Sequence, residues 1–210
     1  MEIKKVAVFV SGGGTNLQAI IDAKNAGKLP FCELSLVLSS NDSAYALTRA
    51  KDNGIASVVV SPKAYGSKAD YAKALIETLE GYGIDIIVLA GFMSILDESF
   101  IQRYENRILN VHPSLIPSFC GEGFYGLRVH EAALMRGVKL TGATVHFVNE
   151  VADGGPIIIQ RAVQVLDGDT PQVLQKRVME QAEWDILPRA LALLSEEKIT
   201  VENDKVFIKQ

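Results

Sequence analysis

Short apolar segments alternate with helical segments through the first half of the chain, and this alternation constrains the fold more than any other feature. Residues 4–11, KKVAVFVS, are apolar and β-branched almost throughout, as is typical of a strand buried on both faces. A helical spacing of apolar residues follows in residues 15–27. Further strands are expected at residues 33–40, 56–61, 85–92 and 107–112. Strands that alternate with helices of about 10–15 residues predict right-handed crossovers. We therefore expect an α/β fold with a doubly wound, mostly parallel, Rossmann-like sheet.

The second half of the chain has a different pattern. Residues 141–150 and 154–165 are two longer strand patterns joined by VADGG, and they predict an antiparallel extension of the sheet. Residues 170–197 form one long helical segment, in which Pro188 predicts a kink or break. The last pattern, residues 198–208, reads as a hairpin with its turn at Asn-Asp.

The composition argues against several classes of protein. The chain has 210 residues, of which 48% are hydrophobic, and this suits one domain over residues 1–210. A net charge of −4 is poorly suited to a nucleic-acid partner. No apolar run approaches the roughly 20 residues of a membrane span, and the first residues lack a signal-peptide pattern. Cys32 and Cys120 form no CxxC pair, so we expect a reducing, cytoplasmic setting.

A glycine-rich loop, SGGGTNLQ, follows the first strand. Gly12 and Gly14 fit the dinucleotide-binding fingerprint, but Leu17 stands where its third glycine belongs. The free N–H groups of Gly14, Thr15 and Asn16 are placed to hold one phosphate at the positive end of a helix. A tight strand-to-helix turn that needs glycine for its backbone angles explains the same letters equally well.

Two polar residues end the fifth predicted strand, in RILNVHPSLIPSF. Asn110 and His112 lie two residues apart, so their side chains face the same side of an extended chain, and Pro113 restricts His112 to that conformation. In open α/β sheets, ligands bind beyond the carboxyl ends of the strands. Asp153, in VADGGP, is a candidate third member, because a carboxylate near His112 would hold its tautomer and raise its pKa.

This set suggests direct transfer between two bound substrates. An imidazolium and an amide N–H₂ make a two-donor site for a developing oxyanion, and the sequence offers no GxSxG nucleophile. Acyl transfer to an amine fits these residues. The alternatives are that His112 is structural or a metal ligand and that DGG is an ordinary turn. His146 reads as a core or sheet residue, and the place of His130 stays open.

Five segments, in this order along the chain, resemble the folate-dependent formyltransferases, and among them those that formylate glycinamide ribonucleotide in purine synthesis. The segments are SGGGTNLQAIID, AGFMSIL, RILNVHPSLIPSF, TGATVHFVNEVADGGPIIIQ and DGDT. The resemblance extends from Val6 to about Leu191. It implies the formyltransferase fold, with residues 1–105 as the nucleotide- and phosphate-binding half and residues 106–210 as the catalytic and folate-binding half.

The resemblance also implies an activity and a set of roles. The formyl group of 10-formyltetrahydrofolate, a co-substrate, would pass to the amine of the ribonucleotide through a tetrahedral intermediate, with no metal. His112 would stabilise the oxyanion and shuttle protons, Asn110 would donate to the same oxygen, and Asp153 would keep His112 charged and oriented. Gly14, Thr15 and Asn16 would bind the phosphate and Glu183 the ribose. The residues implied on the folate side are Lys68, Met93, Ser94, Ile95 and Leu96.

Some positions depart from the family pattern. Lys68 stands where arginine is usual, so it is either a point charge for one of the two substrates or a solvated surface residue. Ser94 and Trp184 replace a common arginine and histidine, and the segment CGEGFYGLRVHEAA is longer than in many members.

The partners expected are the two small-molecule substrates, with no nucleic acid or membrane, and the chain as a monomer or homodimer. Two other functions compete. One is a formyltetrahydrofolate hydrolase, in which water replaces the amine, although its relatives carry an N-terminal regulatory domain that we do not expect here. The other is a non-catalytic ligand-binding module.

Overall fold

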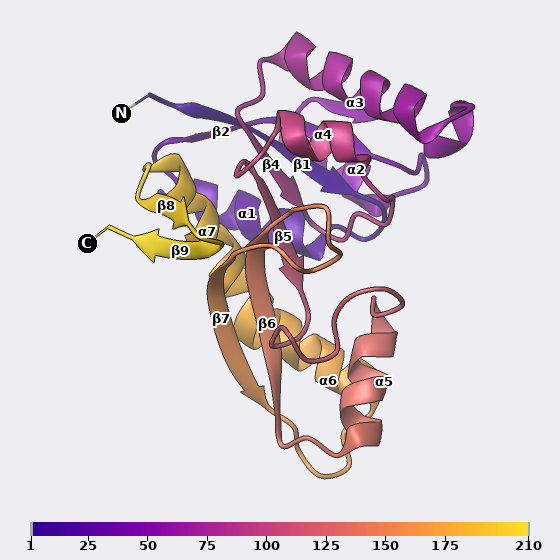
Figure 1. Ribbon diagram of the computed structural model, residues 1–210, viewed down its shortest axis with the longest axis vertical. Coiled ribbons are helices and arrows are strands. Elements are labelled where there is room, and N and C mark those ends of the chain that lie inside the picture. Colours follow the sequence, from indigo (N-terminus) through magenta and orange to yellow (C-terminus); the bar gives the residue numbers. More distant parts are fainter. Residues whose placement is uncertain (1, 210) are drawn as a thin grey trace.

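A seven-stranded sheet forms the centre of the computed structural model, which describes residues 2–209 (Figure 1). The strand order is β3-β2-β1-β4-β5-β6-β7; the pairs from β3 to β5 are parallel, whereas β6 and β7 are antiparallel additions. This confirms the predicted doubly wound sheet with an antiparallel extension. The strands are β1 Lys4–Val10, β2 Cys32–Ser39, β3 Ser57–Val59, β4 Ile86–Leu89, β5 Ile108–His112, β6 Leu140–Phe147 and β7 Ile157–Gln164.

Helices lie on both sides of the sheet, and two of them, α5 and α6, pack against each other beside the antiparallel strand β6 (Figure 1). The helices are α1 Thr15–Asn25, α2 Tyr45–Asp52, α3 Lys68–Tyr82, α4 Glu98–Arg103, α5 Leu127–Arg136, α6 Pro171–Val178 and α7 Trp184–Ser195. Residues of α1, α2, α6 and α7 share a core with one face of β1, whereas α3 and α4 share a core with its other face. Val6 and Val8 point to the first core and Phe9 to the second, which is why β1 is apolar at consecutive positions.

The carboxyl ends of β1, β4 and β5 lie at one edge of the sheet, because these strands run parallel. The loops that leave this edge carry the glycine-rich segment, residues 90–97 and residues 113–126. A hydrogen bond of 2.9 Å from the Met93 N–H to the Ser11 hydroxyl oxygen joins the first two loops. The fold thus gathers segments that are far apart in the sequence at the edge where ligands bind in open α/β sheets.

The step from parallel to antiparallel pairing occurs between β5 and β6. Their register places Asn110 opposite His146 and His112 opposite Thr144, so these four side chains share one face of the sheet. Ile108, on the same face, packs in the core beneath α3 and α4. Near the carboxyl end of β5 the same face is covered by the β6–β7 connection, residues 148–156, and no longer by α3 and α4 (Figure 1).

The long helical segment is broken at a different place from the one expected. Between α6 and α7, Met179–Glu183 forms a π turn, and Pro188 lies inside α7. The irregularity therefore precedes Pro188 by about one turn. Pro188 lacks the N–H that would bind the Trp184 carbonyl, and its ring crowds that carbonyl, so we attribute the wider turn just ahead of Trp184 to this conflict.

The predicted hairpin is present at the end of the chain. Its strands are β8 Ile199–Glu202 and β9 Lys205–Ile208. Asn203 and Asp204 both have positive φ, 51° and 57°, as a two-residue hairpin turn requires. Several strand predictions were too long. β3 is confined to Ser57–Val59, β4 ends at Leu89 and β6 at Phe147, and β7 begins only after Pro156, which has no N–H to pair.

The packing of β6 against β7 gives a test of the fold. A Cβ on Gly142 would lie 2.0 Å from the carbonyl oxygen of Arg161 and 2.9 Å from the Leu115 side chain. We expect Gly142→Ala to lower the free energy of unfolding by about 1–3 kcal/mol, because backbone must shift to admit the methyl group.

Gly81→Ala is the matched control. Gly81 lies in α3, where an added Cβ meets nothing within 4 Å, so alanine should stabilise by about 0.5–1 kcal/mol. Urea unfolding of both variants measures the difference. Equal stabilities would contradict the tight β6–β7 approach.

Candidate active site

Asn110 and His112 lie at the carboxyl end of β5. Their neighbours Leu109 and Val111 are buried on the opposite face, so the alternation of the strand directs the amide and the imidazole to the same side. His112 is 4% exposed. The strand therefore delivers both side chains as the spacing predicted, with the ring largely removed from water.

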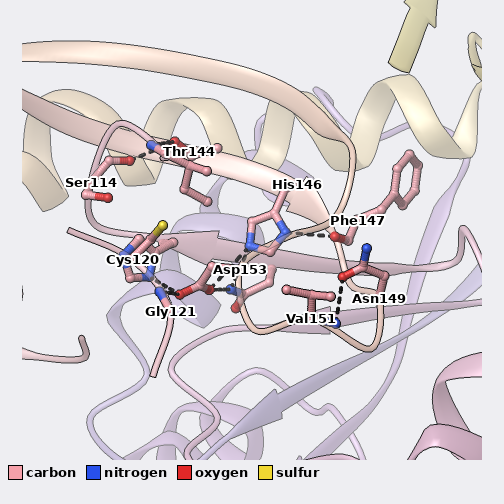
Figure 2. Close-up of polar contacts among 12 residues, drawn as sticks. Ser114, Cys120, Gly121, Thr144, His146, Phe147, Asn149, Val151 and Asp153 are labelled. Carbon is pink, nitrogen blue, oxygen red and sulfur yellow. Dashed lines mark hydrogen bonds and ion pairs between the residues drawn. The ribbon is translucent and has the colours of Figure 1, made fainter. Parts of the chain in front are cut away.

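Asp153 reaches them from the β6–β7 connection. Its φ is +55°, and the turn is closed by a hydrogen bond of 2.9 Å from the Gly154 N–H to the Val151 carbonyl. The Asn149 side chain accepts from the Val151 N–H in the same turn (Figure 2). Gly155 is required here, because a Cβ would lie 1.9 Å from the Phe147 carbonyl oxygen. The glycine lets this connection fold closely against the end of β6.

Asp153 contacts both His112 and Asn110. Asp153 Oδ2 is 3.4 Å from His112 Nδ1, and Asp153 Oδ1 is 3.5 Å from Asn110 Nδ2. The Gly121 N–H donates to Asp153 Oδ2 at 2.8 Å (Figure 2). An amide, an imidazole and a carboxylate from two distant parts of the chain thus form one polar cluster.

His146 is a fourth member that sequence reasoning missed. Its side chain is buried in β6, with Nε2 3.1 Å from Asn110 Nδ2 and 3.6 Å from Asp153 Oδ1. The prediction of a core or sheet residue is confirmed for its burial in β6. It did not include the contacts with Asn110 and Asp153. The register of β5 with β6 places His146 opposite Asn110. No sequence motif predicts this register, because it is set by the pairing of the two strands in the folded sheet.

The loop after β5 rests on the exposed side of His112. The Phe119 carbonyl oxygen lies 2.9 Å from His112 Nε2, and Phe119 itself has a φ of +50°. The ring therefore has an acceptor on each side, the Phe119 carbonyl at Nε2 and Asp153 at Nδ1. In this conformation Nε2 already has a protein partner.

The electrostatics of His112 differ from our expectation. Burial lowers the pKa of His112 below its ordinary value and outweighs the Phe119 carbonyl and Asp153, which both raise it. The expected rise is therefore wrong, because the ring loses more hydration than its two acceptors return. Burial raises the pKa of Asp153, but hydrogen bonds and charge from His146, His112 and Gly121 together bring it below its ordinary value. Asp153 is thus ionised near neutral pH while His112 resists protonation.

The glycine-rich loop forms a tight entry into α1. Gly14 caps the helix with a φ of +70°, and a Cβ there would lie 2.6 Å from the Ala46 side chain. Gly12 and Gly13 have open space where a side chain would project. Arg49 donates to the Gly13 carbonyl at 2.9 Å and holds the loop from outside. Gly14 thus meets a structural need, and the two glycines before it leave the loop backbone accessible.

Glu183 lies under this loop. Asn16 Nδ2 donates to Glu183 Oε2 at 2.7 Å, and Glu183 is 6% exposed. Burial raises the pKa of Glu183 to about 7, against an opposing effect of the Asn16 hydrogen bond. Among residues 2–209, the buried side-chain oxygen of Asn16 has no hydrogen-bond partner. The π turn therefore brings an acidic group against the first turn of α1.

The remaining predicted residues lie on the surface of the same sheet edge. Met93 and Ile95 are 56% and 75% exposed, whereas the alternate residues Ser94 and Leu96 are half-buried. Lys68 is exposed at the start of α3, where its charge helps to lower the pKa of Asp97. None of these five residues makes a described hydrogen bond to the polar cluster, so the structure leaves their roles untested.

An open groove of about 720 Å³ runs between α1 and α7 and is bordered by Thr15, Arg49 and Trp184. Within residues 2–209, no group of three or more His, Cys, Asp or Glu side chains is arranged to hold a metal ion. No helix in the same range combines the length and the apolarity needed to cross a membrane.

A protein-family model described as formyl transferase matches residues 4–191. The chain belongs to the formyl transferase family. The phosphoribosylglycinamide formyltransferase of Haemophilus influenzae is 37% identical to this formyl transferase over 98% of the chain and 94% of that protein. The crystal structure of glycinamide ribonucleotide transformylase 1 from Symbiobacterium toebii is 40% identical, with a TM-score of 0.93, over 99% of this chain and 95% of that one. The chain therefore groups with the phosphoribosylglycinamide formyltransferases.

Two further relatives limit what this membership says. The chain matches the trifunctional purine biosynthetic protein adenosine-3 of Gallus gallus at 44% identity, but it spans only 19% of that protein and 94% of its own length. A formyltetrahydrofolate deformylase structure from Pseudomonas syringae is 27% identical with a TM-score of 0.87, over all of this formyl transferase and 67% of that chain. The shared fold thus accommodates more than one acceptor of the formyl group.

The buried carboxyl of Glu183 predicts a dependence of stability on pH. Its pKa is about 7 in the folded protein, above its ordinary value of 4.5, so the native state holds the proton more tightly. This contribution favours folding at low pH and is lost as the pH rises from about 4.5 to about 7. Glu183→Gln keeps an acceptor for Asn16 and removes the titration. The variant should gain about 2–3 kcal/mol over the wild type between pH 4.5 and 7.5.

Urea unfolding across this pH range measures the difference between the two proteins. His130 has the opposite effect, because burial lowers its pKa to about 4 and stability then rises with pH up to its ordinary pKa of 6.5. Both proteins contain His130, so the comparison removes it. A difference that stays constant with pH would show that Glu183 titrates normally.

Proposed function

We propose that the chain transfers the formyl group of 10-formyltetrahydrofolate to the amine of phosphoribosylglycinamide, in purine biosynthesis. The convergence of Asn110, His112 and Asp153 at the carboxyl edge of the sheet carries this proposal. Membership of the formyl transferase family and the names of its full-length relatives support the choice of reaction. Because the substrate is an amine, no nucleophilic side chain is needed.

The one thiol beside the cluster fits this direct route. Cys120 Sγ donates to the Pro117 carbonyl at 3.3 Å, and burial together with Asp153 raises its pKa. A thiol kept protonated is a poor nucleophile. We therefore assign no covalent formyl-enzyme step to Cys120, and the substrate amine attacks the formyl carbon itself.

In the proposed reaction the attack turns the formyl oxygen into an oxyanion. Asn110 and His112 are the donors to that oxygen. His112, held by Asp153, carries the proton lost by the attacking amine to the folate nitrogen; the oxyanion then returns to a carbonyl, the bond between the formyl carbon and the folate nitrogen breaks, and tetrahydrofolate leaves. His112 Nε2 must leave the Phe119 carbonyl, 2.9 Å away, to serve as a donor. The developing charge then favours a protonated ring, which offsets the burial that lowers the pKa of His112 in the unliganded protein.

The two substrates are assigned to neighbouring loops. The N–H groups of Gly14, Thr15 and Asn16 bind the ribonucleotide phosphate, and Glu183 lies close enough to serve the ribose. Met93, Ser94, Ile95 and Leu96 face the reduced folate with main-chain groups and apolar side chains, and Lys68 meets an anionic group of either substrate. Residues 1–105 then supply most of the phosphate site and residues 106–210 the catalytic groups. The reaction takes place in the cytoplasm and uses no metal.

Replacing His112 tests the oxyanion role. We expect His112→Ala to lower kcat for formyl transfer by about 10²–10⁴-fold, because the variant loses both a donor and a proton carrier. The assay follows the loss of 10-formyltetrahydrofolate with and without phosphoribosylglycinamide. Full activity in a folded variant would end this assignment, and wild-type loss of the formyl group without the amine would indicate the hydrolase instead.

Replacing Gly14 tests the phosphate site. We expect Gly14→Ala to raise the KM for the ribonucleotide at least about tenfold, since the methyl group would clash with Ala46 and displace the N–H groups that meet the phosphate. The KM for the folate should stay the same. Gly13→Ala is the control, because a Cβ there meets nothing within 4 Å.

Two measurements make the result interpretable. Thermal unfolding establishes that Gly14→Ala is folded at the assay temperature. Binding of the ribonucleoside that lacks the phosphate should be equally weak to the wild type and the variant. An equal loss of affinity for ribonucleotide and folate would refute the phosphate assignment.

A further inference from the structure

His146 is a buried polar neighbour of the proposed catalytic side chains Asn110 and Asp153. It is 2% exposed and lies in β6 directly opposite Asn110. Figure 2 shows its ring between the Phe147 carbonyl on one side and Asp153 on the other. Both ring nitrogens therefore have assigned neighbours, and neither is free for a substrate.

The contact at Nδ1 fixes the tautomer of the ring. Nδ1 lies 2.7 Å from the Phe147 carbonyl oxygen, and a carbonyl only accepts. Nδ1 must therefore carry a proton. In the neutral ring Nε2 then has a lone pair, which is directed at Asn110 Nδ2 at 3.1 Å. The amide nitrogen donates to this lone pair, so the nitrogen end of the Asn110 amide is turned toward His146.

The contact with His146 fixes the orientation of the Asn110 side-chain amide. The other contact to the amide nitrogen, from Asp153 Oδ1, is 3.5 Å and too long to hold the group alone. An amide that turns by half a rotation exchanges its nitrogen for its oxygen and would then oppose an oxyanion. With one N–H bound by His146, the second N–H is directed toward Asp153, where the His112 ring also lies. A developing oxyanion can replace the long contact and accept that second N–H.

We propose that His146 is a positioning residue that holds the Asn110 amide with one N–H available to the reacting formyl oxygen. The proposal rests on the function proposed above, since it supposes that Asn110 meets this oxygen. His146 itself touches no substrate. It acts through Asn110.

Two substitutions separate positioning from simple packing. His146→Phe keeps a ring of similar size but removes the acceptor, and His146→Gln returns an acceptor near the place of Nε2. We expect kcat to fall by about 10–100-fold in His146→Phe, as is common for residues that orient an active group, with KM values within about threefold. His146→Gln should recover most of this loss. Thr141→Val is the control, because Thr141 is a buried polar residue of the same strand without a partner, and its kcat should not change.

A double-mutant cycle shows whether the effect passes through Asn110. If His146 acts by orienting the amide, His146→Phe should lower kcat further by less than about threefold once Asn110 is already alanine. Independent, multiplied losses in the double variant would overturn the proposal, as would a normal kcat in folded His146→Phe.

Nuclear magnetic resonance of the ¹⁵N-labelled wild type supplies a readout that needs no activity. We expect His146 as the Nδ1–H tautomer and the Asn110 amide protons as a fixed, inequivalent pair that becomes mobile in His146→Phe and stays fixed in His146→Gln. An Nε2–H tautomer would refute the positioning role even if formyl transfer is confirmed. If the tautomer and the ordered amide are found but the wild type transfers no formyl group, the proposed function fails and the geometric inference about Asn110 stands.

Discussion

The antiparallel pairing of β6 with β5 is the interaction on which the site depends. A parallel sheet buried by helices on both faces leaves no room for polar side chains along its strands. At β5 the pattern changes, because the next strand is antiparallel and its connection to β7 returns across the face that α3 and α4 cover elsewhere. This change places Asn110 beside His146 and brings Asp153 to His112.

Burial and charge are balanced differently at each titrating group near the substrates. At Asp153, hydrogen bonds and neighbouring rings overcome burial and the carboxylate stays ionised. At His112 burial prevails and the ring resists protonation, although two acceptors face it. At Glu183 burial prevails again, and a single hydrogen bond from Asn16 leaves the pKa at about 7. In the proposed reaction, an oxyanion near His112 would favour the protonated ring that burial disfavours in this structure.

Much of the organisation was accessible from the sequence because it depends on local pattern. The buried run of β1, the alternation of strands with helices and the Asn203–Asp204 turn each follow from side chains within a few residues of one another. The same is true of the shared face of Asn110 and His112. The long helical segment shows the limit: Pro188 signalled an irregularity, but the position of the π turn depends on how α6 and α7 pack as well as on the proline.

The sequence by itself determined where most strands and helices lie and that they alternate along the first half of the chain. It also placed the polar residues at the carboxyl ends of the strands. These features are set by periodicity, backbone angles and motif spacing. Only the tertiary structure decided that His146 faces Asn110, that the Phe119 carbonyl covers His112, and that Glu183 lies under Asn16. These contacts join residues in separate elements. Their distances, and the pKa shifts that burial causes, arise only when the sheet is paired and water has been excluded.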